Sequence, residues 1–192
     1  MRIIAGTARG RNLETFTGRD IRPTPDRVRE AVFSALSSRM GGFSSCRVLD
    51  LFAGSGALAL EALSRGAQEA LLVDRSPQAS RLQRANIQRC GFADRAAVLT
   101  GDVLGLLPGL ASKGPFNLVF LDPPYSQNLV LLALEALTGP GLLADGALIC
   151  AEAADKDPVP EKIGPLVRIV HRSYGITAIH FFTFASEMGP PT

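Results

Sequence analysis

The chain has 192 residues, of which 46% are hydrophobic and 20% charged, and its net charge is +2. This length suits one domain with a substantial core and at most a small appendage. No apolar stretch approaches the roughly 20 residues of a membrane span, and arginines stand where a signal peptide would be apolar. We therefore expect a soluble, cytoplasmic monomer with no membrane partner.

Three cysteines, Cys46, Cys90 and Cys150, are widely separated and form no Cys-x-x-Cys pair. Neither a disulfide framework nor a zinc site is indicated, and we expect no metal. Each cysteine is most simply a small hydrophobic core residue.

The positive charge is concentrated near the N-terminus. Residues 1–45 hold eight arginines, four acidic residues and no lysine, a balance of +4. Arginine favours forked contacts to phosphates, although an arginine-solubilised helix face explains the charge nearly as well. The candidates for nucleic-acid contact are Arg9, Arg11, Arg22 and Arg27.

The first 45 residues predict a small hairpin and a helix. Short β-like runs at 2–5 and 12–16 surround a turn, and we assign residues 1–22 to a hairpin extension and 23–192 to the main domain. Apolar residues recur at helical spacing from Asp26 to Arg39, and two glycines follow.

From Cys46 onward, short apolar strands alternate with helical segments, a pattern typical of a mostly parallel sheet in an α/β fold with helices on both faces. The expected strands are 46–51, 69–74, 96–100, 116–121, 146–151, 166–172 and 176–184. The expected helices are 56–65, 76–90, 102–108 and 127–138, with a weak one at most in 155–165. The connection at 173–175 is too short for a crossover, so the last two of the seven strands must form an antiparallel hairpin.

A glycine-rich loop, Ala53 to Gly56, follows the first of these strands and opens a helix. Glycines there let the backbone approach a ligand at the helix N-terminus. Asp74 ends the next strand, 18 residues beyond Gly56, where an acidic side chain can accept from ribose hydroxyls. With Ala59 the loop also satisfies the dinucleotide fingerprint, so a nicotinamide enzyme is a competing interpretation.

Two further carboxylates favour a different nucleotide. Asp50 precedes the loop, where it would repel a pyrophosphate but suit an ammonium group. Asp102 follows the third strand beside the expected adenine position, although it can also cap the next helix. An adenosine with a cationic amino-acid arm fits better than a diphosphate, and S-adenosylmethionine is such a molecule.

A second motif, Asp122-Pro123-Pro124-Tyr125, follows the apolar run 116–121. Two prolines fix the backbone and remove two amide donors, which leaves carbonyl and carboxylate acceptors beside an aromatic ring. Such a site suits a planar group that carries an amino function, for which a nucleobase is the obvious candidate. A strand end with a proline stop is the structural alternative.

Together these motifs resemble the class I S-adenosylmethionine-dependent methyltransferases that modify exocyclic amino groups, which have a Rossmann-like fold. The segments Met1–Leu13, Arg22–Phe33 and the Asp50–Gly56 loop resemble the RsmD family, from the first residue through about Ala185. The resemblance implies methylation of a guanine N2 in 16S rRNA of the small ribosomal subunit. It departs at Tyr125, where phenylalanine is also familiar, and at 152–165, which matches nothing known to us.

The resemblance also implies roles for individual residues. The catalytic residues would be Asp122, Pro123, Pro124 and Tyr125. The cofactor would be held by Asp50, Phe52, Gly54, Ser55, Gly56, Asp74, Arg75, Asp102 and Val103.

Several alternatives stay open at the level of sequence. The catalytic motif alone does not separate guanine N2 from adenine N6 or cytosine N4, in DNA or in other RNA. A nicotinamide oxidoreductase would need a hydride-transfer acid, and the two histidines, His171 and His180, lie in the expected terminal strands. A non-catalytic RNA-binding module would need neither Asp122 nor the glycine loop.

Overall fold

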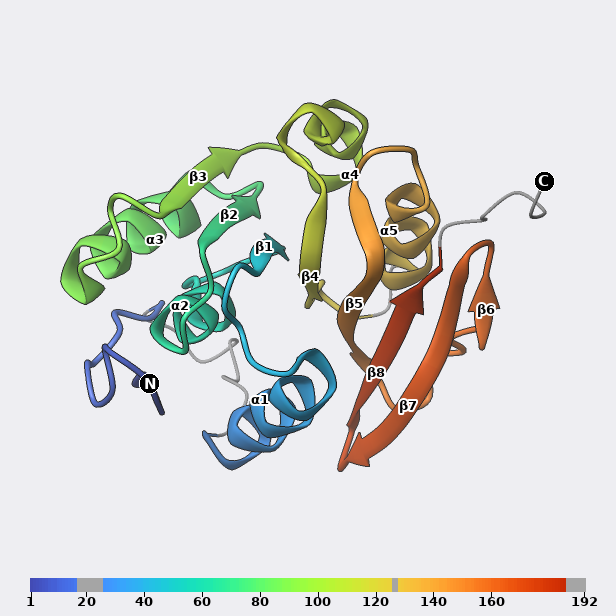
Figure 1. Ribbon diagram of the computed structural model, residues 1–192, viewed down its shortest axis with the longest axis horizontal. Coiled ribbons are helices and arrows are strands. Elements are labelled where there is room, and N and C mark those ends of the chain that lie inside the picture. The colour runs from blue at the N-terminus through green and yellow to red at the C-terminus, as the bar shows by residue number, and fades with distance from the viewer. Residues whose placement is uncertain (17–25, 126–127, 186–192) are drawn as a thin grey trace. The chain divides into compact units, whose positions relative to one another are not determined.

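A computed structural model of the protein describes residues 1–16, 26–125 and 128–185. The chain divides into two compact units, Met1–Val103 and Leu104–Thr192, each of which is described by itself (Figure 1). The expected boundary near residue 22 stays a prediction, since residues 17–25 lie outside the described part.

The N-terminal segment of the first unit folds back on itself without forming extended strands. Arg2 and Asn12 make a single antiparallel bridge, and the Ile3 amide donates to the Arg11 carbonyl at 3.0 Å. The β-like runs expected at 2–5 and 12–16 are therefore reduced to one bridge. The physical reason is that the amides of Ile4 and Ala5 donate to a helix side chain, Glu61, instead of to a partner strand.

The rest of the first unit is a three-stranded parallel sheet with three helices. The strands lie in the order β3-β2-β1, and register pairs include Leu49 with Leu71 and Leu72 with Val98. The central residues of β1 and β2 are buried and, apart from Asp50, apolar, whereas those of β3 are half-buried or exposed. The elements are α1 (Asp26–Met40), β1 (Arg47–Leu51), α2 (Ala57–Ser64), β2 (Glu69–Asp74), α3 (Pro77–Cys90) and β3 (Ala96–Thr100).

In the second unit, five strands lie in the order β4-β5-β8-β7-β6. Strands β4 and β5 are parallel, whereas β5–β8, β8–β7 and β7–β6 are antiparallel. The expected terminal hairpin is thus confirmed. The elements are the 3-10 helix η1 (Leu107–Lys113), β4 (Phe116–Leu121), α5 (Leu129–Leu137), β5 (Leu143–Ala154), β6 (Lys162–Ile163), β7 (Leu166–Tyr174) and β8 (Thr177–Phe184); a short helix, α4 (Val103–Leu106), begins at the boundary between the units.

The stretch 155–165 corrects the sequence interpretation. It contains a turn and the two-residue strand β6 where at most a weak helix was expected, so the described strands number eight instead of seven. Pro158 and Pro160 agree with the absence of a helix there, because proline lacks the amide that a helix interior needs. The additional strand β6 forms through its pairing with the distant strand β7.

In each unit the core is built on the strands. Leu49, Leu51, Leu118 and Phe120 are fully buried. The three cysteines are buried, as expected of small core residues. None of the helices in the described ranges has the length and apolar character that crossing a membrane requires.

Candidate active site

The loop after β1 has a backbone conformation that favours glycine. Gly54 and Gly56 have φ angles of 53° and 79°, and Phe52, which is not a glycine, has 60°. A Cβ at Gly56 would lie 2.7 Å from Cδ2 of Leu72, so the Leu72 side chain would have to shift, and the positive φ angle itself disfavours any other residue. A strained non-glycine residue beside two required glycines is typical of a loop shaped for a ligand.

Two amides from α3 hold the carbonyl groups of this loop. The Gln83 side chain donates to the Gly54 carbonyl and that of Asn86 to the Ser55 carbonyl, each at 3.0 Å. Both side chains are fully buried. Sequence reasoning missed these residues, although their place on the same helix face as apolar Ile87 was a signal.

Asp74 links the glycine loop to the end of β2. One carboxylate oxygen accepts the Gly54 amide at 2.9 Å, and the other accepts the Ser76 amide at 2.8 Å. The Gly101 amide donates to the Asp74 backbone carbonyl at 3.0 Å, which places Asp102 directly after a residue bonded to Asp74. The first unit thus brings most of the expected cofactor residues to the carboxyl ends of β1, β2 and β3.

The remaining expected cofactor residues differ in exposure. Arg75 and Asp102 are exposed, Ser55 is half-buried, and Val103 is buried at the start of α4. Their positions after β2 and β3 agree with a ligand at this edge of the sheet.

Asp50 is the most electrostatically unusual residue of the first unit. It is 1% exposed, and one of its oxygens accepts the Ala59 amide at 3.0 Å while the other has no hydrogen-bond partner among the described residues. Burial raises the pKa of Asp50 to about 7; the Ala59 amide opposes this shift and the charge of Asp74 adds to it. A cation near this loop would stabilise the ionised carboxylate, whereas a pyrophosphate would destabilise it.

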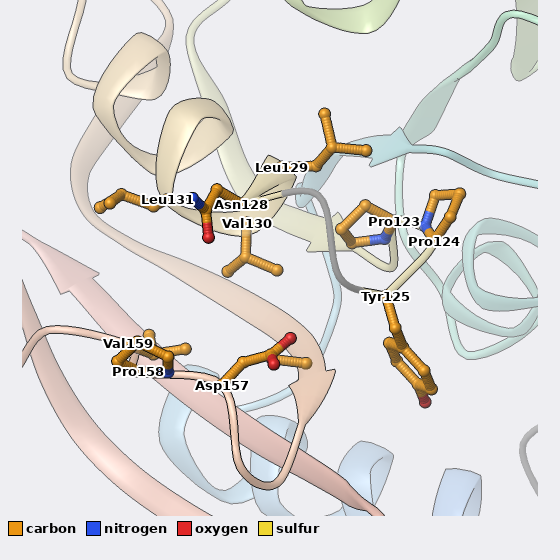
Figure 2. Close-up of a pocket in the computed structure, with 11 residues that line it drawn as sticks. Pro123, Pro124, Tyr125, Asn128, Leu129, Val130, Leu131, Asp157, Pro158 and Val159 are labelled. Carbon is orange, nitrogen blue, oxygen red and sulfur yellow. The ribbon is translucent and has the colours of Figure 1, made fainter.

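In the second unit, the buried strand β4 delivers the predicted catalytic motif. Pro123 is buried, Asp122 is half-buried, and Pro124 and Tyr125 are exposed. A pocket opens beside the motif (Figure 2). It is lined by Pro123, Pro124, Tyr125, Asn128, Leu129, Val130, Leu131, Ala153, Asp157, Pro158 and Val159.

One wall of this pocket comes from the stretch that matched no known pattern. Asp157, Pro158 and Val159 lie opposite the start of α5, and the Asp157 amide donates to the Ala154 carbonyl at 2.9 Å in a turn after β5. No sequence pattern joined 155–165 to the Asp122 motif, because the contact depends on how far β5 extends.

The Tyr125 ring is held through its hydroxyl group. The hydroxyl lies 2.9 Å from Oε1 of Glu152 and 2.7 Å from Oγ1 of Thr177. Burial raises the pKa of Tyr125 to about 12, so the phenol stays protonated at neutral pH. Glu152 and Thr177 were not predicted, since neither belongs to a recognisable motif.

Three of the four arginines proposed for RNA lie in the described part of the chain. Arg9, Arg11 and Arg27 are exposed, whereas Arg22 lies outside the described residues. Arg11 also donates to the carbonyl of Arg89 at 2.6 Å. Arg29, another arginine of α1, is 1% exposed and therefore does not belong to a solvated helix face. It donates to the Arg2 carbonyl at 2.8 Å and to Asp26 at 2.7 Å.

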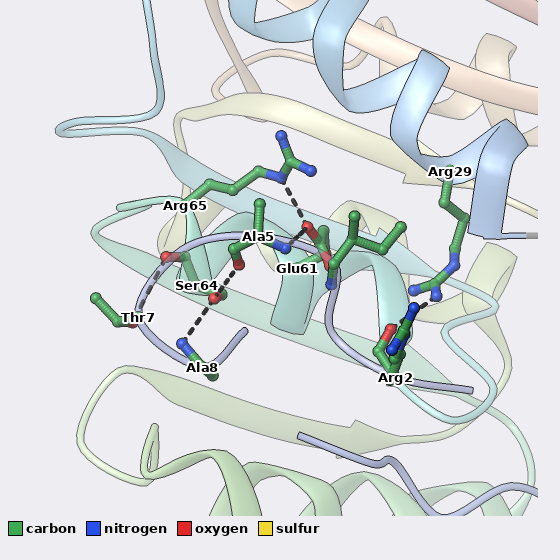
Figure 3. Close-up of polar contacts among 9 residues, drawn as sticks. Arg2, Ala5, Thr7, Ala8, Arg29, Glu61, Ser64 and Arg65 are labelled. Carbon is green, nitrogen blue, oxygen red and sulfur yellow. Dashed lines mark hydrogen bonds and ion pairs between the residues drawn. The ribbon is translucent and has the colours of Figure 1, made fainter. Parts of the chain in front are cut away.

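The N-terminal segment is fastened to α2 by two buried polar side chains (Figure 3). The Glu61 carboxylate accepts the amides of Ile4 at 2.7 Å and Ala5 at 3.0 Å, and it accepts Nε of Arg65 at 2.7 Å. The Ser64 hydroxyl accepts the Ala8 amide at 2.9 Å. This attachment fixes the segment that carries Arg9 and Arg11.

Comparison with known proteins agrees with these features. The model of a family described as "Conserved hypothetical protein 95" matches residues 1–183. Ribosomal RNA small subunit methyltransferase D of Escherichia coli K12 is 39% identical over 83% of this chain and 78% of that protein. The protein of that name from Haemophilus influenzae is 35% identical over 83% of this chain and 81% of its own length.

Solved structures give the same result. The Escherichia coli protein yhhF, described as a candidate methyltransferase, superposes with a TM-score of 0.84 and 35% identity, over 97% of this chain and 99% of that one. A hypothetical protein of Thermus thermophilus has a TM-score of 0.78 and 35% identity, over 94% and 98% of the two chains. The expected α/β fold of the class I methyltransferases is therefore confirmed, and the chain belongs to the RsmD family, that of the ribosomal RNA small subunit methyltransferase D proteins.

Proposed function

We propose that this protein transfers a methyl group from S-adenosylmethionine to the exocyclic N2 amino group of a guanine in 16S rRNA of the small ribosomal subunit. One observation carries the chemistry: a half-buried carboxylate, Asp122, is followed by two prolines and an aromatic ring at the carboxyl end of the parallel strand β4. The names of the relatives support ribosomal RNA as the substrate class.

The first unit suits a cationic adenosine derivative. Asp50 has a buried oxygen without a partner among the described residues, and an ammonium group would stabilise its charge. Asp74 would accept from the ribose hydroxyls, and Asp102 with Val103 would lie by the adenine. The Phe52–Gly56 backbone and Arg75 would complete the contacts. When bound, S-adenosylmethionine supplies an electrophilic methyl group on a sulfonium.

The second unit suits the acceptor amine. The lone pair of a guanine N2 is delocalised into the ring, so the nitrogen is a weak nucleophile. Asp122 and the carbonyl of Pro123 would accept its two hydrogens, aim the nitrogen and stabilise the positive charge that develops on it. Bound S-adenosylmethionine would give up its methyl group and leave as the neutral thioether, and Asp122 or water would take the proton that the methylated amine loses. Tyr125 would stack on the extruded base.

The RNA would be held by arginines on the N-terminal segment and on α1. Arg9 and Arg11 are exposed on the segment that Glu61 and Ser64 anchor, and Arg27 is exposed on α1. Arg29 joins α1 to that segment by donating to the Arg2 carbonyl. Phosphate contacts of this kind position the RNA without reading its bases.

The Asp122→Ala variant tests the proposal. We expect calorimetry to show unchanged S-adenosylmethionine affinity, and assays with labelled cofactor to show no methyl transfer to small subunits from cells that lack this protein. Full turnover by the variant would remove Asp122 from the reaction. Methylation of DNA in preference to the subunits would favour the adenine-N6 or cytosine-N4 alternative.

A further inference from the structure

We propose that Glu152 and Thr177 are positioning residues, which hold the Tyr125 ring through its hydroxyl in the orientation that receives the target base. The inference rests on the proposed function, because it assigns a role in methyl transfer to two residues outside the Asp122 motif. These hydrogen bonds require a tyrosine at position 125, since phenylalanine has no hydroxyl group.

Strand pairing places both residues beside the motif. The last register pair of β4 and β5 joins Leu121 to Ala151. Asp122 and Glu152 directly follow these two paired residues. Strand β5 continues to Ala154, which is paired with Thr177 on β8. Alternation along β5 puts Glu152 on the face of Ala154, and the directly opposed Thr177 shares that face.

The hydrogen bonds have one consistent direction. An ionised carboxylate only accepts, so the phenol donates its single hydrogen to Glu152 at 2.9 Å. Thr177 must then donate to the phenol oxygen at 2.7 Å. Two partners on two strands fix the position of the oxygen, and the ring cannot swing about its Cα–Cβ bond while both bonds persist.

The ring would otherwise have little to hold it. Tyr125 is 39% exposed, yet it lines the pocket together with Pro123 and Asp157 (Figure 2). A ring with several rotamers presents its face to an entering base for only part of the time, which lowers the population of reactive complexes. Because phosphate contacts supply most of the RNA affinity, we expect the loss in kcat and not in KM.

The test compares Tyr125→Phe, Thr177→Val and Glu152→Leu, each of which removes hydrogen bonds but retains side-chain volume. We expect Thr177→Val and Glu152→Leu each to lower kcat on subunits from deficient cells by roughly 3- to 10-fold, the effect of one hydrogen bond, and Tyr125→Phe, which loses both bonds, to lower it by at least as much. KM and S-adenosylmethionine affinity should stay unchanged. The double variant Tyr125→Phe/Glu152→Leu should be no slower than Tyr125→Phe alone.

Three further variants serve as controls. Glu152→Gln keeps an acceptor oxygen but removes the charge, so it should retain most of the rate if the hydrogen bond is what matters. Thr183→Val lies on the same strand as Thr177, and Glu135→Leu lies on the exposed face of α5; both should leave kcat unchanged. A loss in Glu152→Gln equal to that in Glu152→Leu would assign the effect to charge and overturn the proposal.

Fluorescence gives a readout that is independent of activity. The chain has no tryptophan and two tyrosines, so Tyr174→Phe leaves Tyr125 as the sole intrinsic fluorophore of its kind. In that background, Thr177→Val and Glu152→Leu should lower the anisotropy of Tyr125. Unchanged anisotropy would contradict the hydroxyl contacts, and lowered anisotropy with normal kcat would contradict their role in the reaction. A wild-type protein inactive on the subunits would instead refute the proposed function, and this inference with it.

Discussion

Asp50, at the end of β1, accepts the backbone amide of Ala59 in the first turn of α2 at 3.0 Å. This bond caps a helix whose own N-cap residue, Gly56, has no side chain to offer. The same carboxylate is buried with its second oxygen unpartnered among the described residues. Asp50 therefore serves the local structure through one oxygen and leaves the other for a ligand's charge.

The first prediction concerns Asp50→Asn, which keeps the shape and an acceptor for Ala59 but removes the charge. The pKa of Asp50 is raised from 3.8 to about 7, because burial favours the neutral carboxyl in the folded state. The protonated group therefore stabilises the fold fully below pH 3.8, and this stabilisation is lost as the pH rises through 7. At pH 8 the unliganded variant should be more stable than wild type by on the order of 2 kcal/mol, by urea unfolding. It should also bind S-adenosylmethionine at least tenfold more weakly, by calorimetry.

Wild-type affinity for S-adenosylmethionine should also fall as the pH drops below 7, because protonation removes the charge that the ammonium meets. Asp94→Asn, at an exposed turn, is the matched control and should change neither quantity. Equal cofactor affinity in wild type and Asp50→Asn would show that this carboxylate does not meet the ligand's charge.

The second prediction concerns Glu61→Ala, which removes the acceptor of two backbone amides and the partner of Arg65 (Figure 3). Breaking a buried pair leaves uncompensated polar groups, so the free energy of unfolding should fall by roughly 3 kcal/mol or more. Glu30→Ala on the exposed face of α1 should cost far less. Thermal denaturation of both variants makes the comparison, and equal losses would mean that Glu61 does not anchor the N-terminal segment.

The third prediction concerns acid stability through His180. It is 3% exposed, stacks on His171 at 4.8 Å, and neither ring nitrogen has a partner among the described residues. Burial first, then the charges of His171 and Arg168, lower its pKa from 6.5 to about 4, whereas Asp155 opposes the shift. Stability should therefore decline as the pH falls from 6.5 toward 4, because the unfolded state takes up the proton first.

His180→Leu should remove that decline. Between pH 7 and 4.5 wild type should lose roughly 2 kcal/mol more than the variant, in urea unfolding at both values. Parallel losses in the two proteins would show that His180 is protonated without cost in the folded state.

The fourth prediction concerns Arg9→Ala on the anchored N-terminal segment. One lost phosphate contact should reduce the slope of log affinity against log salt concentration by about one, in binding to small-subunit RNA. Arg172→Ala, an exposed arginine on β7, should leave the slope as it is. An unchanged slope for Arg9→Ala would place the RNA elsewhere.

The sequence predicted the strands, loops and hairpin that local residue patterns define. Strands β1 to β4 are within one residue of their expected bounds, because each is a short, mostly apolar run with polar or glycine-rich flanks. The Gly54 loop and the Asp122 motif could be predicted because glycines and prolines, which have distinctive backbone properties, directly follow the strands. The hairpin of β7 and β8 followed from a connection too short for any crossover.

What the sequence could not predict depends on contacts far apart in the chain. Glu61 gains its role only because the N-terminal segment, 56 and 57 positions away, donates two backbone amides to it. Glu152 and Thr177 likewise gain their role only from the registers of β5 with β4 and β8. No local pattern encodes which helix face or strand end a distant segment will meet.

Nucleoside analysis of small-subunit RNA methylated by the purified protein tests transfer to guanine N2 directly. Subunits from cells lacking the protein would be incubated with labelled S-adenosylmethionine. The RNA would then be digested to nucleosides, which mass spectrometry would identify. Wild-type protein should place the label in N2-methylguanosine at one position, and Asp122→Ala should place none. Label in a methylated adenine or cytosine, or on a ribose or ring atom, would contradict methyl transfer to guanine N2.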